Sequence, residues 1–111
     1  MPDTTIRQDA GVVTLINVFT VDQADQQRLL DAWQQATDEV IRHLPGFISA
    51  NLHRSLDGTK VVNYAQWANQ EAFAAMLQNA NVHPHLEEIQ HIGQAAPILC
   101  EVVSTHHHSK S

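Results

Sequence analysis

Val61-Val62-Asn63-Tyr64-Ala65-Gln66-Trp67 is the stretch that decides the fold, because it is dense in β-branched and aromatic residues and predicts a half-buried strand. Side chains alternate across a strand, so Asn63, Ala65 and Trp67 are expected on one face. Ala65 is small and leaves space between a carboxamide and an indole N–H. The alternative is that Trp67 packs in the core and Asn63 lies at a fray or bulge, since most tryptophans are packing residues.

Before this stretch, the sequence predicts a strand over residues 11–21 and then an amphipathic helix. Asn17 interrupts the apolar face of the strand, and a buried asparagine usually bonds backbone at a bulge or an adjacent edge. Asp22 is expected to cap the helix with its side chain. The buried stripe of the helix contains Leu29, Trp33, Ala36, Val40 and Leu44, with Trp33 expected as a core residue. Pro45-Gly46 ends the helix.

The rest of the chain predicts a hairpin, a second helix and a last strand. Strands over 47–55 and 61–67 flank Asp57-Gly58, which favours a tight turn because glycine tolerates positive φ. Asn69 is expected to cap the next helix, which restarts at His83-Pro84. The last strand is expected over residues 98–103.

This element order, β-α-β-β-α-β, predicts an α+β domain of the ferredoxin-like type over residues 11–103, with a four-stranded antiparallel sheet. Residues 1–10 and 104–111 are expected to be flexible termini. The sheet face away from the helices is expected to carry Ile48, Ala50, Leu52, Val62 and Tyr64. An apolar face of this kind predicts a homodimer with the two sheets face to face, a dimeric α+β barrel.

Composition excludes several classes of partner. The 111 residues carry a formal net charge of -6, which disfavours nucleic acid and anionic membranes. No apolar run predicts a signal peptide or a membrane span. Cys100 is the single cysteine, and a cytoplasmic location is therefore expected.

The strand-to-helix segment resembles the antibiotic biosynthesis monooxygenase family. The resemblance rests on the Asn63 and Trp67 pair, on Glu71-Ala72-Phe73 after it and on Pro45-Gly46-Phe47 before it, with a similar opening strand over residues 14–19. It implies a monooxygenase that oxidises an electron-rich quinol or anthrone to a quinone with dioxygen. It also implies that no metal, haem or flavin cofactor takes part, and that Asn63 and Trp67 are the catalytic residues.

The pocket that the resemblance implies for a small aromatic substrate is formed by Asn17, Phe19, Phe73, Leu77 and His85. No side chain stands out from the sequence as the proton acceptor. His53, His83 and His85 are candidates by their titration range alone.

Three alternatives remain open at this stage. Haem degradation, found in related dimeric barrels, would use Asn17 and a histidine ligand near His85, but Met76 or Leu77 stands where a tryptophan is expected. A divalent metal site would draw on His83, His85, Glu87, Glu88 and His91, of which only Glu87 and His91 have i, i+4 spacing. The third alternative is a dimer that binds an aromatic ligand without catalysis. His106-His107-His108 is a tag remnant or a natural tail and is excluded from function.

Overall fold

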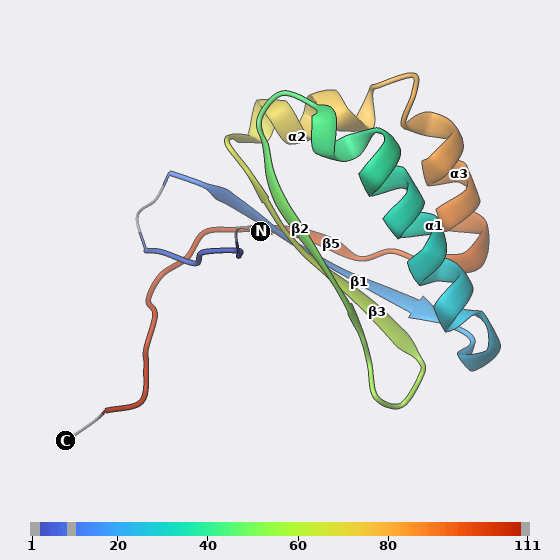
Figure 1. Ribbon diagram of the computed structural model, residues 1–111, viewed down its shortest axis with the longest axis horizontal. Helices are drawn as coiled ribbons and strands as arrows, with labels where there is room; N and C mark the ends of the chain where they lie inside the picture. The colour runs from blue at the N-terminus through green and yellow to red at the C-terminus, as the bar shows by residue number, and fades with distance from the viewer. Residues whose placement is uncertain (1–2, 9–10, 110–111) are drawn as a thin grey trace.

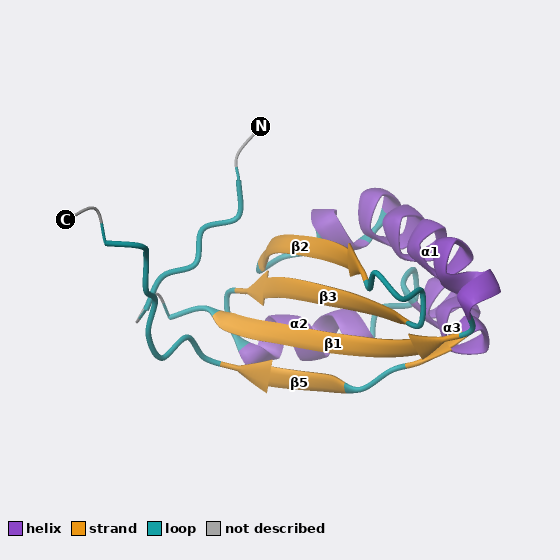
Figure 2. Ribbon diagram, turned by 90° about the horizontal axis from the view of Figure 1, so that it is seen from below, coloured by secondary structure: helices purple, strands orange, loops and turns teal. Residues whose placement is uncertain are grey.

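The computed structural model describes residues 3–8 and 11–109, and it forms one antiparallel sheet with its helices on one face (Figures 1 and 2). The predicted α+β, ferredoxin-like order is confirmed, with the second helix divided in two. In chain order the elements are β1 Val13–Val21, η1 Gln23–Asp25, α1 Gln26–Glu39, η2 Ile41–His43, β2 Phe47–Arg54, β3 Lys60–Trp67, α2 Gln70–Leu77, α3 His83–Ile92, β4 Gly93–Gln94 and β5 Pro97–Cys100. Among the described residues no helix is both long and apolar enough to cross a membrane.

The centre of the sheet is the antiparallel pair β1 and β3. The strand order is β2-β3-β1-β4, with β5 also paired to β1. Leu15 pairs with Ala65 and Asn17 with Asn63. Because directly paired residues share a face, these side chains all point toward the helices. The core between this face and α1 includes Phe19, Leu29, Ala36, Val61 and Trp67.

A β-bulge between Phe47 and Ser49 changes which residues of β2 face outward. Past the bulge, Ala50 pairs with Ala65 and Leu52 with Asn63, so both belong to the helix-covered face. The prediction that Ala50 and Leu52 lie on the open face was wrong, because the extra residue shifts the side-chain alternation by one. The open face instead carries Ser49, Asn51 and His53, beside Gln66, Tyr64 and Val62.

Capping differs between the two predicted helix starts. Asn69 caps α2 as expected, with its Oδ1 accepting from the backbone N–H of Ala72 at 2.8 Å. Asp22 makes no side-chain capping bond, so that prediction was wrong. The chain first forms the 3₁₀ turn η1, in which the Asp22 carbonyl accepts from the N–H of Asp25 at 2.8 Å. The last turn before Pro45 is likewise 3₁₀, a common way to satisfy helix-end groups.

The last strand is shorter and earlier than predicted, and it is interrupted. β4 pairs with Thr20 and Val21, and β5 pairs with residues 14–17. Ala96, between them, exchanges backbone hydrogen bonds with Val18 and donates its N–H to Asn17 Oδ1 at 3.2 Å. Residues after Cys100 lead away from the sheet rather than continuing the strand to Val103 (Figures 1 and 2).

The Asp57-Gly58 turn closes the β2–β3 hairpin as predicted, with Gly58 at φ 81°. Asp57 Oδ1 accepts from the backbone N–H of Thr59 at 3.0 Å, from its hydroxyl at 2.7 Å and from the Ser55 hydroxyl at 2.8 Å. These bonds stabilise the carboxylate, and the one from the Thr59 backbone contributes most. They lower the pKa of Asp57 to about 2.

Part of the N-terminal segment lies on the open face of the sheet. The Thr4 hydroxyl donates to Asn51 Oδ1 at 2.6 Å, and Gln66 Nε2 donates to the carbonyl of Thr5 at 2.8 Å. Residues 3–8 therefore have specific contacts with β2 and β3. Flexibility of the two terminal segments stays a prediction, and residues 1–2, 9–10 and 110–111 lie outside the described part of the chain.

Gly46 provides a test of the junction between η2 and β2. It has φ 83°, and a Cβ placed there would collide with the Cβ of Ala72 on α2. We expect Gly46→Ala to lower the free energy of unfolding by about 2–4 kcal/mol, since left-handed strain and overpacking add. Gly11→Ala is the matched control, because Gly11 has φ 71° and no atom of the described residues lies within 4 Å of the added Cβ. The Gly11→Ala change should lower the free energy of unfolding, measured by urea denaturation, by about 1 kcal/mol. Equal losses for both variants would contradict the close approach at Gly46.

Candidate functional site

A small cavity of about 20 Å³ lies between the helix-covered face of the sheet and the helices. It brings Asn63 and Trp67 together on one face of β3, as their spacing predicted. The lining residues are Leu15, Trp33, Thr37, Ile41, Phe47, Ala50, Asn63, Ala65, Trp67 and Met76. Most of these side chains are apolar, so the polar groups among them are shielded from water and their electrostatic interactions are strengthened.

Trp67 closes one side of the cavity and is held there by two aromatic rings. It is 1% exposed, and its ring meets Phe47 edge-on at a centroid distance of 5.4 Å and Phe73 at 6.2 Å. Contacts of this geometry are favourable and fix the ring plane. Phe73, predicted to bind substrate, therefore stands behind Trp67 rather than in the cavity lining.

Asn63 is 4% exposed, and its Oδ1 is buried without a hydrogen-bond partner among the described residues. A buried amide oxygen left unpaired costs about 1–3 kcal/mol, so such groups are uncommon in structural positions. This cost is consistent with a side chain reserved for a ligand.

Trp33 belongs to the same site, which the sequence did not reveal. It is 6% exposed, packs edge-on against Phe19 at 5.5 Å and lines the cavity from α1. Its Nε1 is buried with no partner among the described residues. The sequence did contain one signal for this residue. A tryptophan on the buried face of a helix has an indole N–H that needs a hydrogen-bond partner inside the protein.

Asn17 has a structural partner. It lies directly across from Asn63, but its Oδ1 accepts from the N–H of Ala96 at 3.2 Å. This is the backbone bond at an adjacent edge that the sequence suggested for a buried asparagine. Asn17 therefore links the β4–β5 junction to β1.

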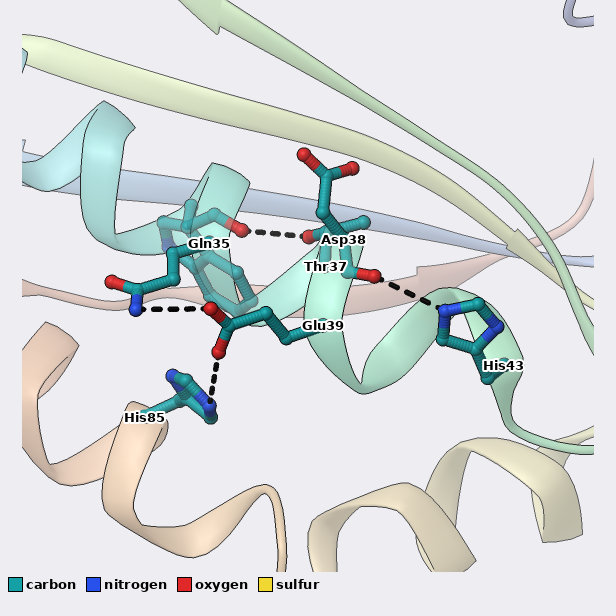
Figure 3. Close-up of polar contacts among 7 residues, drawn as sticks. Gln35, Thr37, Asp38, Glu39, His43 and His85 are labelled. Atoms are coloured by element: carbon teal, nitrogen blue, oxygen red, sulfur yellow. Dashed lines mark hydrogen bonds and ion pairs between the residues drawn. The ribbon is translucent and has the colours of Figure 1, made fainter.

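None of the five predicted binding residues is among the described residues that line the cavity: Asn17, Phe19, Phe73, Leu77 and His85. Leu77 is 40% exposed at the end of α2. His85 lies on α3 facing α1, where its Nε2 is 3.8 Å from Glu39 Oε2 (Figure 3). Gln35 Nε2 donates to the other oxygen of Glu39 at 3.2 Å. A role for Leu77 or His85 in substrate binding stays a prediction.

The candidate proton acceptors also lie elsewhere. His53 Nδ1 is 2.9 Å from the carbonyl of Asn51, and His83 Nε2 is 3.0 Å from that of Leu77. The described residues that line the cavity include no ionisable side chain. Nor does the described part of the chain contain a group of three or more His, Cys, Asp or Glu residues placed to hold a metal ion.

The arrangement is therefore a buried, mostly apolar cavity lined by two indole rings, one carboxamide and the hydroxyl-bearing Thr37. Indole N–H groups only donate, whereas the carboxamide both donates and accepts. Such groups stabilise negative charge on a bound oxygen atom, because a fixed donor in an apolar pocket needs no reorganisation as the charge develops.

Known proteins with similar sequences and structures share the whole domain. The antibiotic biosynthesis monooxygenase family matches residues 12–91. Tetracenomycin-F1 monooxygenase from Streptomyces glaucescens is 43% identical over 98 residues, which is 88% of each chain. A mutant of SnoaB, a cofactor-independent oxygenase from Streptomyces nogalater, aligns with a TM-score of 0.78 and 25% identity over 86% of this chain and 97% of that one. The ActVA-Orf6 monooxygenase of Streptomyces coelicolor, in complex with nanaomycin D, aligns with a TM-score of 0.77 and 30% sequence identity. The alignment covers 91% of this chain and 96% of that one.

The bond from Ala96 to Asn17 leads to a stability prediction. We expect Asn17→Ala to lower the free energy of unfolding by about 1 kcal/mol, because one hydrogen bond at the sheet edge is lost. Urea denaturation measures the change. Gln94→Ala removes an exposed amide from the neighbouring β4 and should stay within about 0.5 kcal/mol of the parent. If the Asn17→Ala protein were as stable as the Gln94→Ala control, the result would contradict a structural role for Asn17.

Proposed function

Since the chain belongs to the antibiotic biosynthesis monooxygenase family and is a monooxygenase, we propose that it oxidises an electron-rich aromatic substrate of the quinol or anthrone type to a quinone. Dioxygen is the oxidant, and no metal, haem or flavin takes part. The observation that carries the proposal is the burial of Asn63 and Trp67 around one cavity, with the Asn63 oxygen unpaired in the described structure.

The named relatives support the substrate class and the absence of a cofactor. The relative with 43% identity is a tetracenomycin-F1 monooxygenase, and SnoaB is a cofactor-independent oxygenase. ActVA-Orf6 was solved with nanaomycin D bound. We therefore infer a flat, polycyclic, oxygen-bearing ligand for this chain, and tetracenomycin F1 is the first compound to test.

The substrate itself supplies the electrons. An anthrone that loses a proton from its ring CH₂ becomes a delocalised anion, which passes one electron to dioxygen. The substrate radical and superoxide then join in a C–O bond, and a proton completes the hydroperoxide. Cleavage of the O–O bond with loss of the remaining C–H proton gives the quinone carbonyl and one water. One atom of dioxygen thus enters the product, and the other leaves as water.

In this scheme Asn63 and Trp67 stabilise the charge on oxygen. The Asn63 carboxamide donates an N–H to the substrate oxygen, and the Trp67 indole donates to the same oxygen or to the peroxide. Each donor contributes about 2–4 kcal/mol to the transition state, by analogy with oxyanion holes. The mostly apolar lining shields these bonds from bulk solvent and strengthens them.

The cavity has to enlarge to admit the substrate. At about 20 Å³ it is far smaller than a polycyclic ring system. Its helix side is formed by Trp33 and Thr37 of α1 together with Ile41 in η2 and Met76 on α2, and a methionine side chain adapts easily to a new shape. We infer that the ring enters between η2 and α2 and displaces the side chains of Ile41 and Met76, while β3 stays in place.

The pocket favours an anion without removing the proton. No ionisable side chain is among the described lining residues. We therefore assign the deprotonation to the acidity of the substrate, with solvent water as the proton acceptor. Asn63 and Trp67 lower the free energy of the resulting anion. Turnover should then follow the ionisation of the substrate rather than that of a histidine.

A second copy of this chain is proposed to cover the open face of the sheet. Ile48 on β2 and Ile98 on β5 are about half exposed there. The Tyr64 hydroxyl and the Thr14 hydroxyl are buried without a partner among the described residues. Packing of two such faces would bury the apolar side chains and offer partners to the hydroxyls.

Removal of the donors tests the catalytic assignment. We expect Asn63→Ala and Trp67→Phe each to lower kcat/KM by about ten- to a thousandfold, since each removes one donor to the developing charge. The measurement is oxygen uptake in metal-free buffer with tetracenomycin F1 and a panel of quinols and anthrones. Gln34→Ala removes an exposed amide on α1 and should retain the parent rate. If both donor-removing variants turn over every accepted substrate at the parent rate, Asn63 and Trp67 are packing residues.

The dimer is tested separately by sedimentation equilibrium. At micromolar concentration the mass should be about twice that of one chain, because a sheet face of this kind supports an interface of about 1,200–2,000 Å². Ile48→Glu and Ile98→Glu place charges on that face and should shift the equilibrium toward the single chain. A folded protein of single-chain mass at every concentration would contradict the dimer.

A further inference from the structure

Two buried polar atoms of opposite hydrogen-bonding type belong to residues on opposite walls of the cavity. Trp33 Nε1, from α1, is a donor only, and Asn63 Oδ1, from β3, is an acceptor. Neither has a hydrogen-bond partner among the described residues. Each of these atoms, if left without a hydrogen bond, would destabilise the folded state by about 1–3 kcal/mol. A single hydrogen-bonding partner shared by both atoms would remove both penalties.

The cavity has the size and lining for one water molecule. A water needs about 10–15 Å³ of such space and two to four polar partners. The cavity measures about 20 Å³, and it is lined by Trp33 and Asn63, whose Nε1 and Oδ1 are buried without a partner among the described residues. Thr37 also lines it, and its hydroxyl already donates to the carbonyl of Trp33 at 2.7 Å (Figure 3). The lone pairs of that hydroxyl remain available to accept from the water.

We propose that Trp33 is a positioning residue, which holds a buried water that in turn orients the Asn63 carboxamide. The water accepts from the Trp33 indole N–H and donates to Asn63 Oδ1. With its oxygen engaged on the α1 side, the carboxamide turns its N–H₂ group toward the substrate. This inference rests on the proposed function only in the last step, where that N–H₂ group meets the substrate oxygen.

Orientation matters because the two ends of a carboxamide have opposite effects on an anion. The N–H end stabilises a negatively charged oxygen, whereas the C=O end repels it. The Asn63 oxygen has no hydrogen-bond partner among the described residues, so a bond donated by the water would fix which way this oxygen points. Trp33 therefore acts on the reaction through Asn63 and does not touch the substrate.

Dioxygen is the competing occupant of a space this small. It accepts only weakly and donates nothing, so it would leave Asn63 Oδ1 unpaired. Water pairs both atoms at once, and the geometry points to water for that reason. Xenon separates the two outcomes experimentally, because it enters dry apolar cavities.

The first test does not depend on activity. A high-resolution crystal structure of the protein should show one water shared by Trp33 and Asn63, and Trp33→Phe should lose it. The Trp33 indole N–H should exchange slowly with solvent and show a cross-relaxation contact to a bound water by NMR. Xenon at this position in the parent crystal, or an indole N–H that contacts no water, would overturn the proposal.

The second test is a double-mutant cycle on turnover. Trp33→Phe keeps an aromatic side chain, although a smaller one, and removes the donor, and it should lower kcat by about tenfold with KM within about twofold. In an Asn63→Ala background the same change should alter kcat by less than about twofold, because the side chain that the water orients is gone. Equal factors in both backgrounds would show that Trp33 acts independently of Asn63 and would overturn the proposal.

Thr37→Val provides a second variant if Trp33→Phe fails to fold. It removes one partner of the water while conserving shape, and a smaller loss of kcat is expected, again absent in the Asn63→Ala background. An equal loss in both backgrounds would again count against the proposal. Should the parent oxidise no quinol or anthrone, the proposed function fails, and the crystallographic and NMR tests still decide whether the water site exists.

Discussion

The antiparallel register of β1 against β3 is the constraint on which the structure depends. It places Asn17 directly opposite Asn63, and Leu15 and Ala65 one pleat further along on the same covered face. A slip of one residue would turn every one of these side chains to the open face. Of the two asparagines, Asn17 is bonded to Ala96 at the sheet edge, and the oxygen of Asn63 has no partner among the described residues. One residue thus stabilises the sheet, and the other is free to serve a ligand.

Asn63 is surrounded by aromatic side chains that are held in place by ring contacts and by aliphatic side chains that are able to repack. Trp67 is fixed between Phe47 and Phe73, and Trp33 packs on Phe19. The helix side contains an aliphatic residue of η2 and a methionine of α2, which are able to repack. A monooxygenase that relies on its substrate for electrons has few requirements: a site shielded from bulk solvent, oriented donors and room for a flat ring. In the proposed mechanism the sheet provides the first two, and movement of the helix-side residues provides the third.

Much of this could be predicted from the sequence, because strand alternation and turn chemistry are local properties. Alternation was sufficient to place Asn63 and Trp67 on one face, and the cap at Asn69 followed from residue type. The β2 bulge was not predictable, since one extra residue reverses the alternation without altering composition. That the Trp33 indole N–H has no partner among the described residues was missed for a related reason. Amphipathic periodicity assigns a residue to the buried face of a helix but does not show whether its polar atom finds a partner there.

The central claim is that a buried, oriented carboxamide and indole suffice for oxygen insertion into an ionised aromatic substrate. Single-turnover oxidation of an anthrone under ¹⁸O₂ in metal-free buffer tests it most directly. The account predicts one labelled atom in the new quinone carbonyl and one in water, at a rate unaffected by chelators and lowered in Asn63→Ala. Unlabelled quinone, or turnover that stops when metal is chelated, would contradict it.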